Sequence, residues 1–210
     1  GNVNYFLQFD MNLLMNDNGT WSTIPTPPAM ATDYGAAMKV APNGNLYIGT
    51  KNNGLFEWDG QNWTNYNTTT TGVPLDNIRG MDIADDGTIW IGTLQKGLVR
   101  FDGSSWSNYN VASSGLPGND VAVVRADLAG GVWLATTNQQ MVSYFNGTTC
   151  TNYDLAPVWN SPTNRVRSLA VDKKNHLWIG SSWTPLTKFD GIAFKEYPMS
   201  GSYPGHGVVD

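Results

Sequence analysis

Apolar residues of this chain occur in short segments that polar turns separate. In the stretch 78–109 the segments are 78–84, 88–93, 97–101 and 105–109, and Gly, Asp and Asn are frequent between them. Such turn residues are typical of tight hairpins between antiparallel strands. No window keeps the 3.6-residue apolar period of an amphipathic helix. The pattern predicts an all-β chain of short strands.

The four-strand pattern recurs along the chain. A turn of Asp or Asn followed by Gly has its glycine at positions 60, 103, 147 and 191, and a tyrosine stands at 66, 109, 153 and 197. Four short strands in every repeat of about 43 residues are the signature of a β-propeller blade. We therefore predict a β-propeller of four-stranded antiparallel blades.

A second recurring position carries an aromatic residue in the second strand of each repeat, namely Tyr47, Trp90, Trp133 and Trp178. Sheets with apolar residues on both faces are covered only by neighbouring sheets, so we expect these rings to pack between adjacent blades. Cys150 stands where the sister repeats have Trp or Phe. A packed structural thiol is therefore favoured over a nucleophile.

Complete four-strand units are predicted at 35–66, 78–109, 121–153 and 165–197. The segment 5–24 matches strands two to four of another unit, and 207–210 matches a first strand. Pairing these two segments would close a five-bladed ring as a single domain, 1–210, without exposed sheet edges. The alternative is a stretch of a larger ring, in which the match at 207–210 is a coincidence.

Composition excludes several classes of protein. The net charge of −5 argues against nucleic acid, which basic stripes recognise, and against anionic membrane surfaces. No apolar run approaches 18 residues, so we expect no membrane insertion. One cysteine and two histidines leave little for a disulfide framework or a metal site. We predict neither metal nor cofactor.

Loops that depart from the repeat are the candidate binding site. Trp159, in the loop 154–164, and Trp183 have no counterparts in the other repeats, and exposed aromatic rings can stack on a sugar ring while polar neighbours orient it. The alternative is that these two rings pack on each other. The full predicted site consists of Phe9, Trp159, Asn160, Asn164, Arg165, Arg167, Trp183, Tyr203 and His206.

Polar residues also stand just before each first strand, where a propeller has its channel entrance. They are Asp33, Asp76, Asn77, Asn119, Asp120, Asn164, Arg165 and His206. Facing carboxylates there could act as acid and base or hold a cation, but Asp and Asn are also common turn formers. Asp127 and Asp172 recur at one repeat position and are predicted to cap the first hairpin.

Three segments carry a resemblance to a known family: 86–93 (DGTIWIGT), 97–103 (GLVRFDG) and 114–121 (SGLPGNDV). They resemble the two-component regulator propeller repeat. The resemblance implies a bacterial, extracytoplasmic protein, either a periplasmic sensor region that receives oligosaccharide signals or a secreted or cell-surface protein. The chain departs from this repeat at two places: Ala135 stands where the repeat has Gly, and 181–186 replace the short Gly-Leu turn. The family commonly builds rings of more than five blades.

The leading hypothesis is a non-enzymatic propeller that binds an oligosaccharide or peptide on its loop face. The alternative is a structural module with a protein partner. A third hypothesis is a lyase, because streptogramin lyases have a loosely similar repeat. That chemistry resembles metal-assisted elimination and needs His and Glu close together, whereas Glu57 and Glu196 fall near blade edges. We therefore expect no enzyme activity.

Overall fold

The computed structural model describes residues 3–8, 11–137, 139–161 and 163–197, and these form five antiparallel sheets joined by one-turn helices. The first sheet has three strands, β1 (Val3–Leu7), β2 (Leu13–Asp17) and β3 (Thr20–Ile24), and α1 (Pro28–Ala31) follows it. The second sheet consists of β4 (Gly35–Val40), β5 (Leu46–Thr50), β6 (Leu55–Trp58) and β7 (Trp63–Tyr66), followed by α2 (Thr68–Thr71).

The other three sheets repeat the four-strand order. The third consists of β8 (Ile78–Ile83), β9 (Ile89–Thr93), β10 (Gly97–Phe101) and β11 (Trp106–Tyr109), followed by α3 (Val111–Ser114). The fourth consists of β12 (Val121–Ala126), β13 (Val132–Thr136), β14 (Met141–Phe145) and β15 (Cys150–Asp154), followed by α4 (Ala156–Trp159). The fifth consists of β16 (Val166–Val171), β17 (Leu177–Ser181), β18 (Leu186–Phe189) and β19 (Phe194–Tyr197).

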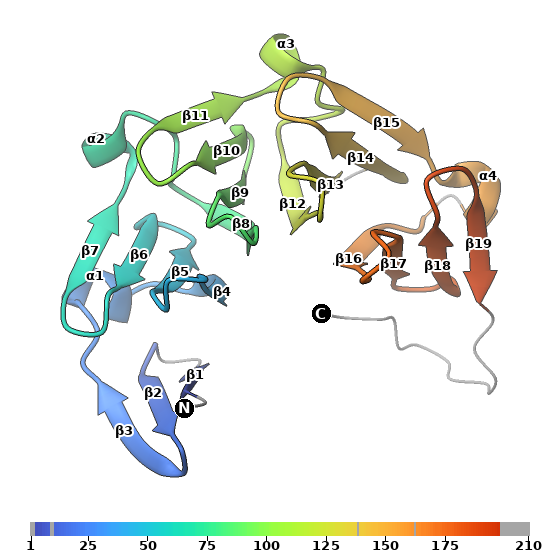
Figure 1. Cartoon of the computed structure of the whole chain (residues 1–210). Helices are drawn as coiled ribbons and strands as arrows, with labels where there is room; N and C mark the ends of the chain where they lie inside the picture. The colour runs from blue at the N-terminus through green and yellow to red at the C-terminus, as the bar shows by residue number, and fades with distance from the viewer. Residues whose placement is uncertain (1–2, 9–10, 138, 162, 198–210) are drawn as a thin grey trace.

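The sheets follow one another around an arc, with the first strand of each four-stranded sheet on the inner side and the fourth strand at the outer rim (Figure 1). The three-stranded sheet and the β16–β19 sheet stand at the two ends of this arc. The predicted closing strand at 207–210 lies outside the described residues. Among the described helices, none has the length and apolar character needed to cross a membrane.

Apolar residues of neighbouring sheets form the cores between them. The ring of Trp90 in β9 is 1% exposed and meets Phe145 of the next sheet edge-on, with the centroids 6.0 Å apart. Trp133 meets Phe189 of the following sheet in the same way at 5.8 Å. The predicted packing of the recurring aromatic residues between sheets is thus confirmed at both positions.

Ile-Gly-Thr occurs in the second strand of two sheets, at 48–50 and 91–93, and its glycine lets adjacent sheets approach. A Cβ atom on Gly92 in β9 would stand 2.5 Å from the carbonyl oxygen of Val121 in β12. Such a contact is far inside van der Waals distance, so a side chain here would force the two sheets apart. Thr93 follows and is fully buried, and its hydroxyl donates to the carbonyl oxygen of Gly97 at 2.7 Å.

The short helices after the fourth strands were not predicted from the apolar pattern. The side chain of Asn67 accepts hydrogen bonds from the backbone N–H groups of Thr69 and Thr70, and Thr70 returns a bond to the backbone of Asn67. Asn110 makes the same capping box with Ser113. A polar cap with a hydroxyl residue three positions later is a local signal for a helical turn, and one turn is too short to show an apolar period.

Candidate ligand-binding face

Trp159 is part of the core and does not stand on an exposed loop. Its side chain is 4% exposed, and it packs in one cluster with Leu155 and Val166. The indole N–H donates to the hydroxyl of Thr187 in β18 at 2.9 Å. The expectation of an exposed ring at Trp159 is therefore wrong, because α4 folds its last residue onto the sheet, and the predicted stacking role lacks the accessible ring that it needs. Asn160, with a φ of 43°, ends that helix where Gly72 and Gly115 end α2 and α3.

Trp183 lies in the loop between β17 and β18 and is 68% exposed. The residue before it, Ser182, accepts a hydrogen bond at 2.7 Å from the Nε atom of Arg167 in β16. The two tryptophans therefore have different environments, one buried against β18 and one in solvent. Of the two, Trp183 alone presents a ring that a ligand can reach.

Asn164 and Arg165 join the same loop to the start of β16. Asn164 is fully buried, and its amide donates to the hydroxyl of Thr184 at 2.7 Å, while its Oδ1 atom has no hydrogen-bond donor among the described residues. The guanidinium of Arg165 donates to the carbonyl oxygen of Asn164 at 2.6 Å. Of the predicted site residues, Phe9, Tyr203 and His206 lie outside the described part of the chain.

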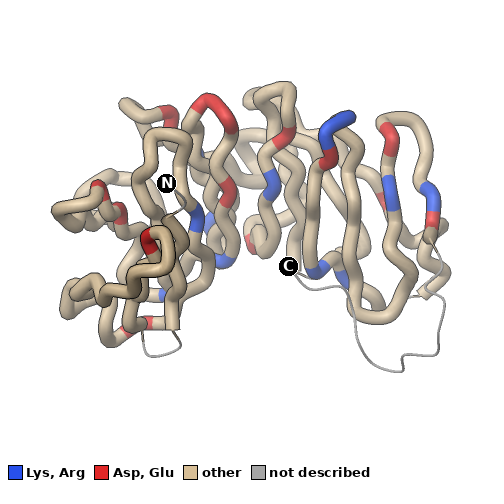
Figure 2. Tube along the Cα trace, turned by 60° about the horizontal axis from the view of Figure 1, so that its bottom comes forward, with Lys and Arg blue, Asp and Glu red and all other residues tan. Residues whose placement is uncertain are grey.

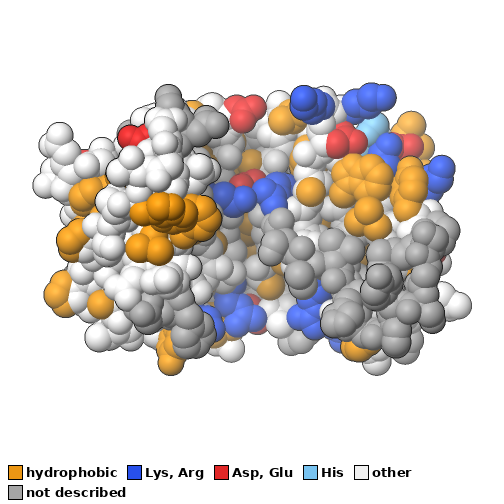
Figure 3. All heavy atoms as spheres, turned by 90° about the horizontal axis from the view of Figure 1, so that it is seen from below, with side chains coloured by type: hydrophobic (Ala, Val, Ile, Leu, Met, Phe, Trp, Pro, Cys, Tyr) orange, Lys and Arg blue, Asp and Glu red, His pale blue; other side chains and the backbone are white. Residues whose placement is uncertain are grey.

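The inner strands of the arc line a cavity of about 400 Å³. Basic residues occur along these strands (Figure 2), and in the space-filling view their side chains form an upper and a lower group in the hollow (Figure 3). The described basic residues that line the cavity are Lys39 of β4, Arg79 of β8, Arg125 of β12 and Arg167 of β16. Arg167 thus both lines the cavity and donates to Ser182 in the loop of Trp183.

Two aspartates contact these basic side chains. Asp82 lies 3.4 Å from the Nζ atom of Lys39 and 3.5 Å from the guanidinium of Arg125. Asp120 lies 3.8 Å from the Nε atom of Arg79. Apart from Arg167, the sequence interpretation missed the basic residues of this wall. An alignment of the repeats reveals two of these residues, because Arg79 and Arg167 hold equivalent first-strand positions in two repeats.

Polar residues at the predicted channel entrance are engaged by the chain itself. Burial acts to raise the pKa of the Asp33 carboxyl, but N–H groups of Tyr34 and Asn52 donate to it and bring its pKa below the ordinary value. Asp76 accepts from the hydroxyl of Thr68 at 2.8 Å. The turn-forming interpretation of these two residues is favoured. No group of three or more acidic, His or Cys side chains suited to a metal occurs among the described residues.

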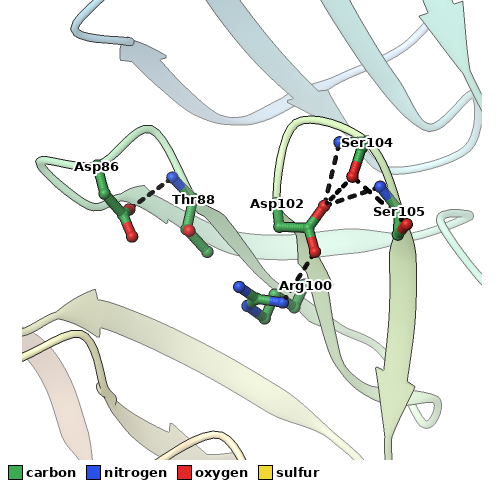
Figure 4. A network of polar contacts seen from close by, with 6 residues as sticks. All are labelled: Asp86, Thr88, Arg100, Asp102, Ser104 and Ser105. Atoms are coloured by element: carbon green, nitrogen blue, oxygen red, sulfur yellow. Dashed lines mark hydrogen bonds and ion pairs between the residues drawn. The ribbon is translucent and has the colours of Figure 1, made fainter.

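Aspartates of the hairpins hold the turns that the sequence predicts. Asp102 accepts from the backbone N–H groups of Ser105 and Ser104 and from the Ser104 hydroxyl, and it pairs with Arg100 at 3.2 Å (Figure 4). These donors, the Ser105 N–H first among them, lower the pKa of Asp102 to about 2. Asp86 accepts from the N–H of Thr88 in the neighbouring hairpin. Such aspartates are structural elements of the turns.

Asp127 and Asp172 cap the first hairpin of their sheets, as predicted. Asp127 accepts from the backbone N–H of Gly131 at 2.7 Å. Asp172 accepts from the N–H of His176 at 3.0 Å and from the indole of Trp178 at 3.1 Å. These donors, led by the His176 N–H, hold the pKa of Asp172 well below its usual range.

Comparisons with solved structures place the chain among propellers. The extracellular domain of a hybrid two component system from B. thetaiotaomicron superimposes with a TM-score of 0.72 at 18% identity, over 98% of this chain and 30% of that chain. YCF48 bound to D1 peptide gives 0.70 at 16% identity, over 93% of this chain and 63% of that chain. A catalytically inactive virginiamycin B lyase from Staphylococcus aureus with quinupristin gives 0.71 at 13% identity, over 91% and 64%.

At these identities the likeness concerns the fold alone, and the chain spans less than two thirds of the length of each of these structures. A comparison with curated proteins found no match. The model of one family, described as two component regulator propeller, matches residues 160–183, which include Trp183 and the start of β16. The chain is thus a propeller-like all-β protein that carries a repeat of the two component regulator propeller type.

Proposed function

We propose that this chain is a non-enzymatic, extracytoplasmic recognition segment of a bacterial sensor or surface protein. It binds an oligosaccharide or peptide where the loop of Trp183 meets the inner wall of the arc. The observation that carries the proposal is the continuity between these two features. Arg167 lines the cavity of about 400 Å³ and donates to Ser182, the residue next to the exposed ring.

Size and chemistry of this region support ligand binding. Pockets for small ligands have volumes of roughly 300–1,000 Å³ and combine apolar walls with a few polar groups. Here the apolar wall comes from Met38, Met81 and Val123, and the polar groups are guanidinium and ammonium groups. The exposed indole of Trp183, which follows the residue bonded to Arg167, adds a flat surface for a sugar or aromatic ring.

The absence of enzyme activity is part of the proposal. Glu57 accepts hydrogen bonds from Tyr47 and Tyr66, at 2.7 Å each, inside the β4–β7 sheet. His176 contacts Asp172 at 3.0 Å in the turn before β17. These groups belong to different sheets and have structural partners, whereas acid–base catalysis needs groups that converge on one substrate.

A glycan array and a peptide library, followed by titration with tryptophan fluorescence, test the proposal. A ligand from either source is expected to bind, and Trp183→Ala is expected to weaken it at least tenfold. Trp21→Ala is the matched control, because Trp21 is also exposed (58%) but lies in β3, in the sheet at the other end of the arc. No binding on either library, or equal losses in both variants, would contradict the proposed site.

A protein-interaction module is the second candidate function, and one feature favours it. Phe6 and Trp21 on the three-stranded sheet are 47% and 58% exposed, with ring centroids 5.1 Å apart. Exposed aromatic pairs are frequent in protein interfaces. Capture of a protein partner that Trp21→Ala abolishes and Trp183→Ala leaves intact would favour this function over ligand binding.

We also propose that residues 207–210 supply the inner strand of the first sheet and thereby close a five-bladed ring. Among the described strands β1 pairs with β2 alone, so its inner edge is available. Deleting 207–210 is then expected to lower the melting temperature, because an unpaired edge replaces a paired one. An unchanged melting temperature would favour a stretch of a larger ring.

A further inference from the structure

Two sets of equivalent positions face the hollow from the first strands. One set reads Lys39, Asp82, Arg125 and Ala170, and the other reads Ala36, Arg79, Ala122 and Arg167. Residues that match between repeats are explained by packing, which is the same in every sheet. Residues at these positions differ from sheet to sheet, so packing does not account for their identity.

Arginine and alanine alternate in the second set. Arg79 of β8 and Arg167 of β16 are separated by Ala122 of β12, and all three line the same cavity. Ala122 itself contributes only a methyl group between the two arginines, while Asp120 and Thr137 next to the same sheet contact Arg79. The alternation therefore places two long cationic groups around one recess.

The inner wall carries an excess of positive charge although the chain as a whole is acidic. Four basic residues face two carboxylates there, which leaves a local excess of two positive charges in a chain of net charge −5. The carboxylate of Asp82 is shared between Lys39 and Arg125 and also accepts the backbone N–H of Ala126 at 2.9 Å. These contacts hold the side chains of Lys39, Asp82 and Arg125 in place.

The charges of Arg79 and Arg167 are less compensated by nearby carboxylates than those of Lys39 and Arg125. The distance of 3.8 Å between Arg79 and Asp120 is longer than the 3.4 Å and 3.5 Å that separate Asp82 from Lys39 and Arg125. The guanidinium of Arg79 also donates to the neutral hydroxyl of Thr137 at 3.4 Å. Arg167 donates to the neutral hydroxyl of Ser182. Guanidinium groups present planar pairs of donors that match the two oxygens of a carboxylate or sulfate. Both arginines can therefore turn to an anionic group in the recess.

We propose that the cavity takes an acidic oligosaccharide, whose carboxylate or sulfate group lies between Arg79 and Arg167 above Ala122. This inference rests on the proposed function and names the class of its ligand. In this proposal the sugar ring next to the anionic group contacts the indole of Trp183, whose neighbour Ser182 is hydrogen-bonded to Arg167. An acidic peptide offers the same charge but no pyranose face for the exposed indole, so the saccharide is favoured.

Titration calorimetry with three probes tests the proposal: tetragalacturonate, the neutral maltotetraose and the peptide tetraglutamate. Tetragalacturonate is expected to bind best. Arg79→Gln and Arg167→Gln are each expected to weaken it at least tenfold. Arg100→Gln is the matched control, because Arg100 pairs with Asp102 at an outer hairpin and does not line the cavity. Thermal unfolding of every variant verifies that it is folded.

The outcomes separate this inference from the proposed function. If a neutral glycan from the array binds in a manner that depends on Trp183 while both arginine variants are unaffected, the proposed function holds and the acidic ligand is overturned. If tetraglutamate binds more tightly than tetragalacturonate, and both arginines are needed, the ligand is a peptide and the saccharide is overturned. If none of the probes or library members binds, both proposals fail.

Discussion

Replacing Trp159 with alanine is expected to destabilise the fold strongly, although the residue lies in a segment that departs from the repeat. The side chain is 4% exposed and packs between α4 and the β16–β19 sheet. A tryptophan buries roughly 150–250 Å², which at about 25 cal/mol per Å² corresponds to an upper estimate of roughly 4–6 kcal/mol. Measured Trp→Ala substitutions in cores cost about 3–5 kcal/mol.

The hydrogen bond of the indole can be separated from its packing. Trp159→Phe keeps most of the buried ring and removes the bond to Thr187, whose hydroxyl still donates to the carbonyl oxygen of Pro185 at 3.3 Å. A single neutral hydrogen bond contributes about 1 kcal/mol, so the phenylalanine variant should lose about 1–2 kcal/mol. Trp183→Ala is the exposed counterpart, and its effect should stay within about 0.5 kcal/mol.

Urea unfolding followed by circular dichroism measures these differences directly. For a chain of this size each kcal/mol corresponds to roughly 2–4 °C in melting temperature, so Trp159→Ala should lower it by roughly 6–20 °C. The refuting result is a Trp159→Ala variant with unchanged stability that has lost its ligand. That outcome would make Trp159 a ligand contact and would contradict its assignment to the core.

Three further predictions concern packing, pH and thiol chemistry. Gly92→Ala should cost about 1–3 kcal/mol in urea unfolding, because its Cβ would stand 2.5 Å from the carbonyl oxygen of Val121. Asp102 has a pKa of about 2 in the folded chain, below its value in the unfolded chain, so its stabilising effect is present above about pH 4 and is lost as the pH falls towards 2. Asp102→Asn, which imitates Asn146 of the next repeat, should therefore differ from the wild type at pH 7 and converge with it near pH 2 in thermal unfolding. Burial raises the pKa of the Cys150 thiol, so Ellman's reagent should react slowly at pH 8 until urea unfolds the chain; rapid reaction without urea would contradict the packed position.

Repetition made most of the fold accessible from the sequence. Recurring aromatic residues such as Trp90, and turn aspartates such as Asp127, report the same local environment several times, so one interpretation is checked against its copies. No other repeat has a tryptophan at the position of Trp159, so the repeat pattern predicts a surface loop there. The true equivalents of Trp159 are the residues that precede Gly72 and Gly115, and only the left-handed conformation shared by Asn160 and these glycines makes that correspondence visible.

The charged residues of the inner wall form no local sequence motif. Arg79 and Arg167 are 88 positions apart and become neighbours of one cavity only through the stacking of the first strands. No local motif reports such a pairing, because each arginine belongs to an ordinary strand. When the repeats are aligned by their first strands, both arginines fall at the same position and alternate with alanine.

The two sets of inner-wall residues differ in how firmly the fold holds them, and the proposed binding role follows this difference. Asp82 connects three neighbouring strands by contacting Lys39, Arg125 and the backbone of β12, so its row resists rearrangement. A buried charge that lost such partners would be costly. Arg79 has a more distant carboxylate and the neutral hydroxyl of Thr137 as partners, and Arg167 has the neutral hydroxyl of Ser182. In the proposed complex the incoming anion replaces these partners. The proposed ligand contacts therefore lie in the row whose charges are least compensated within the fold.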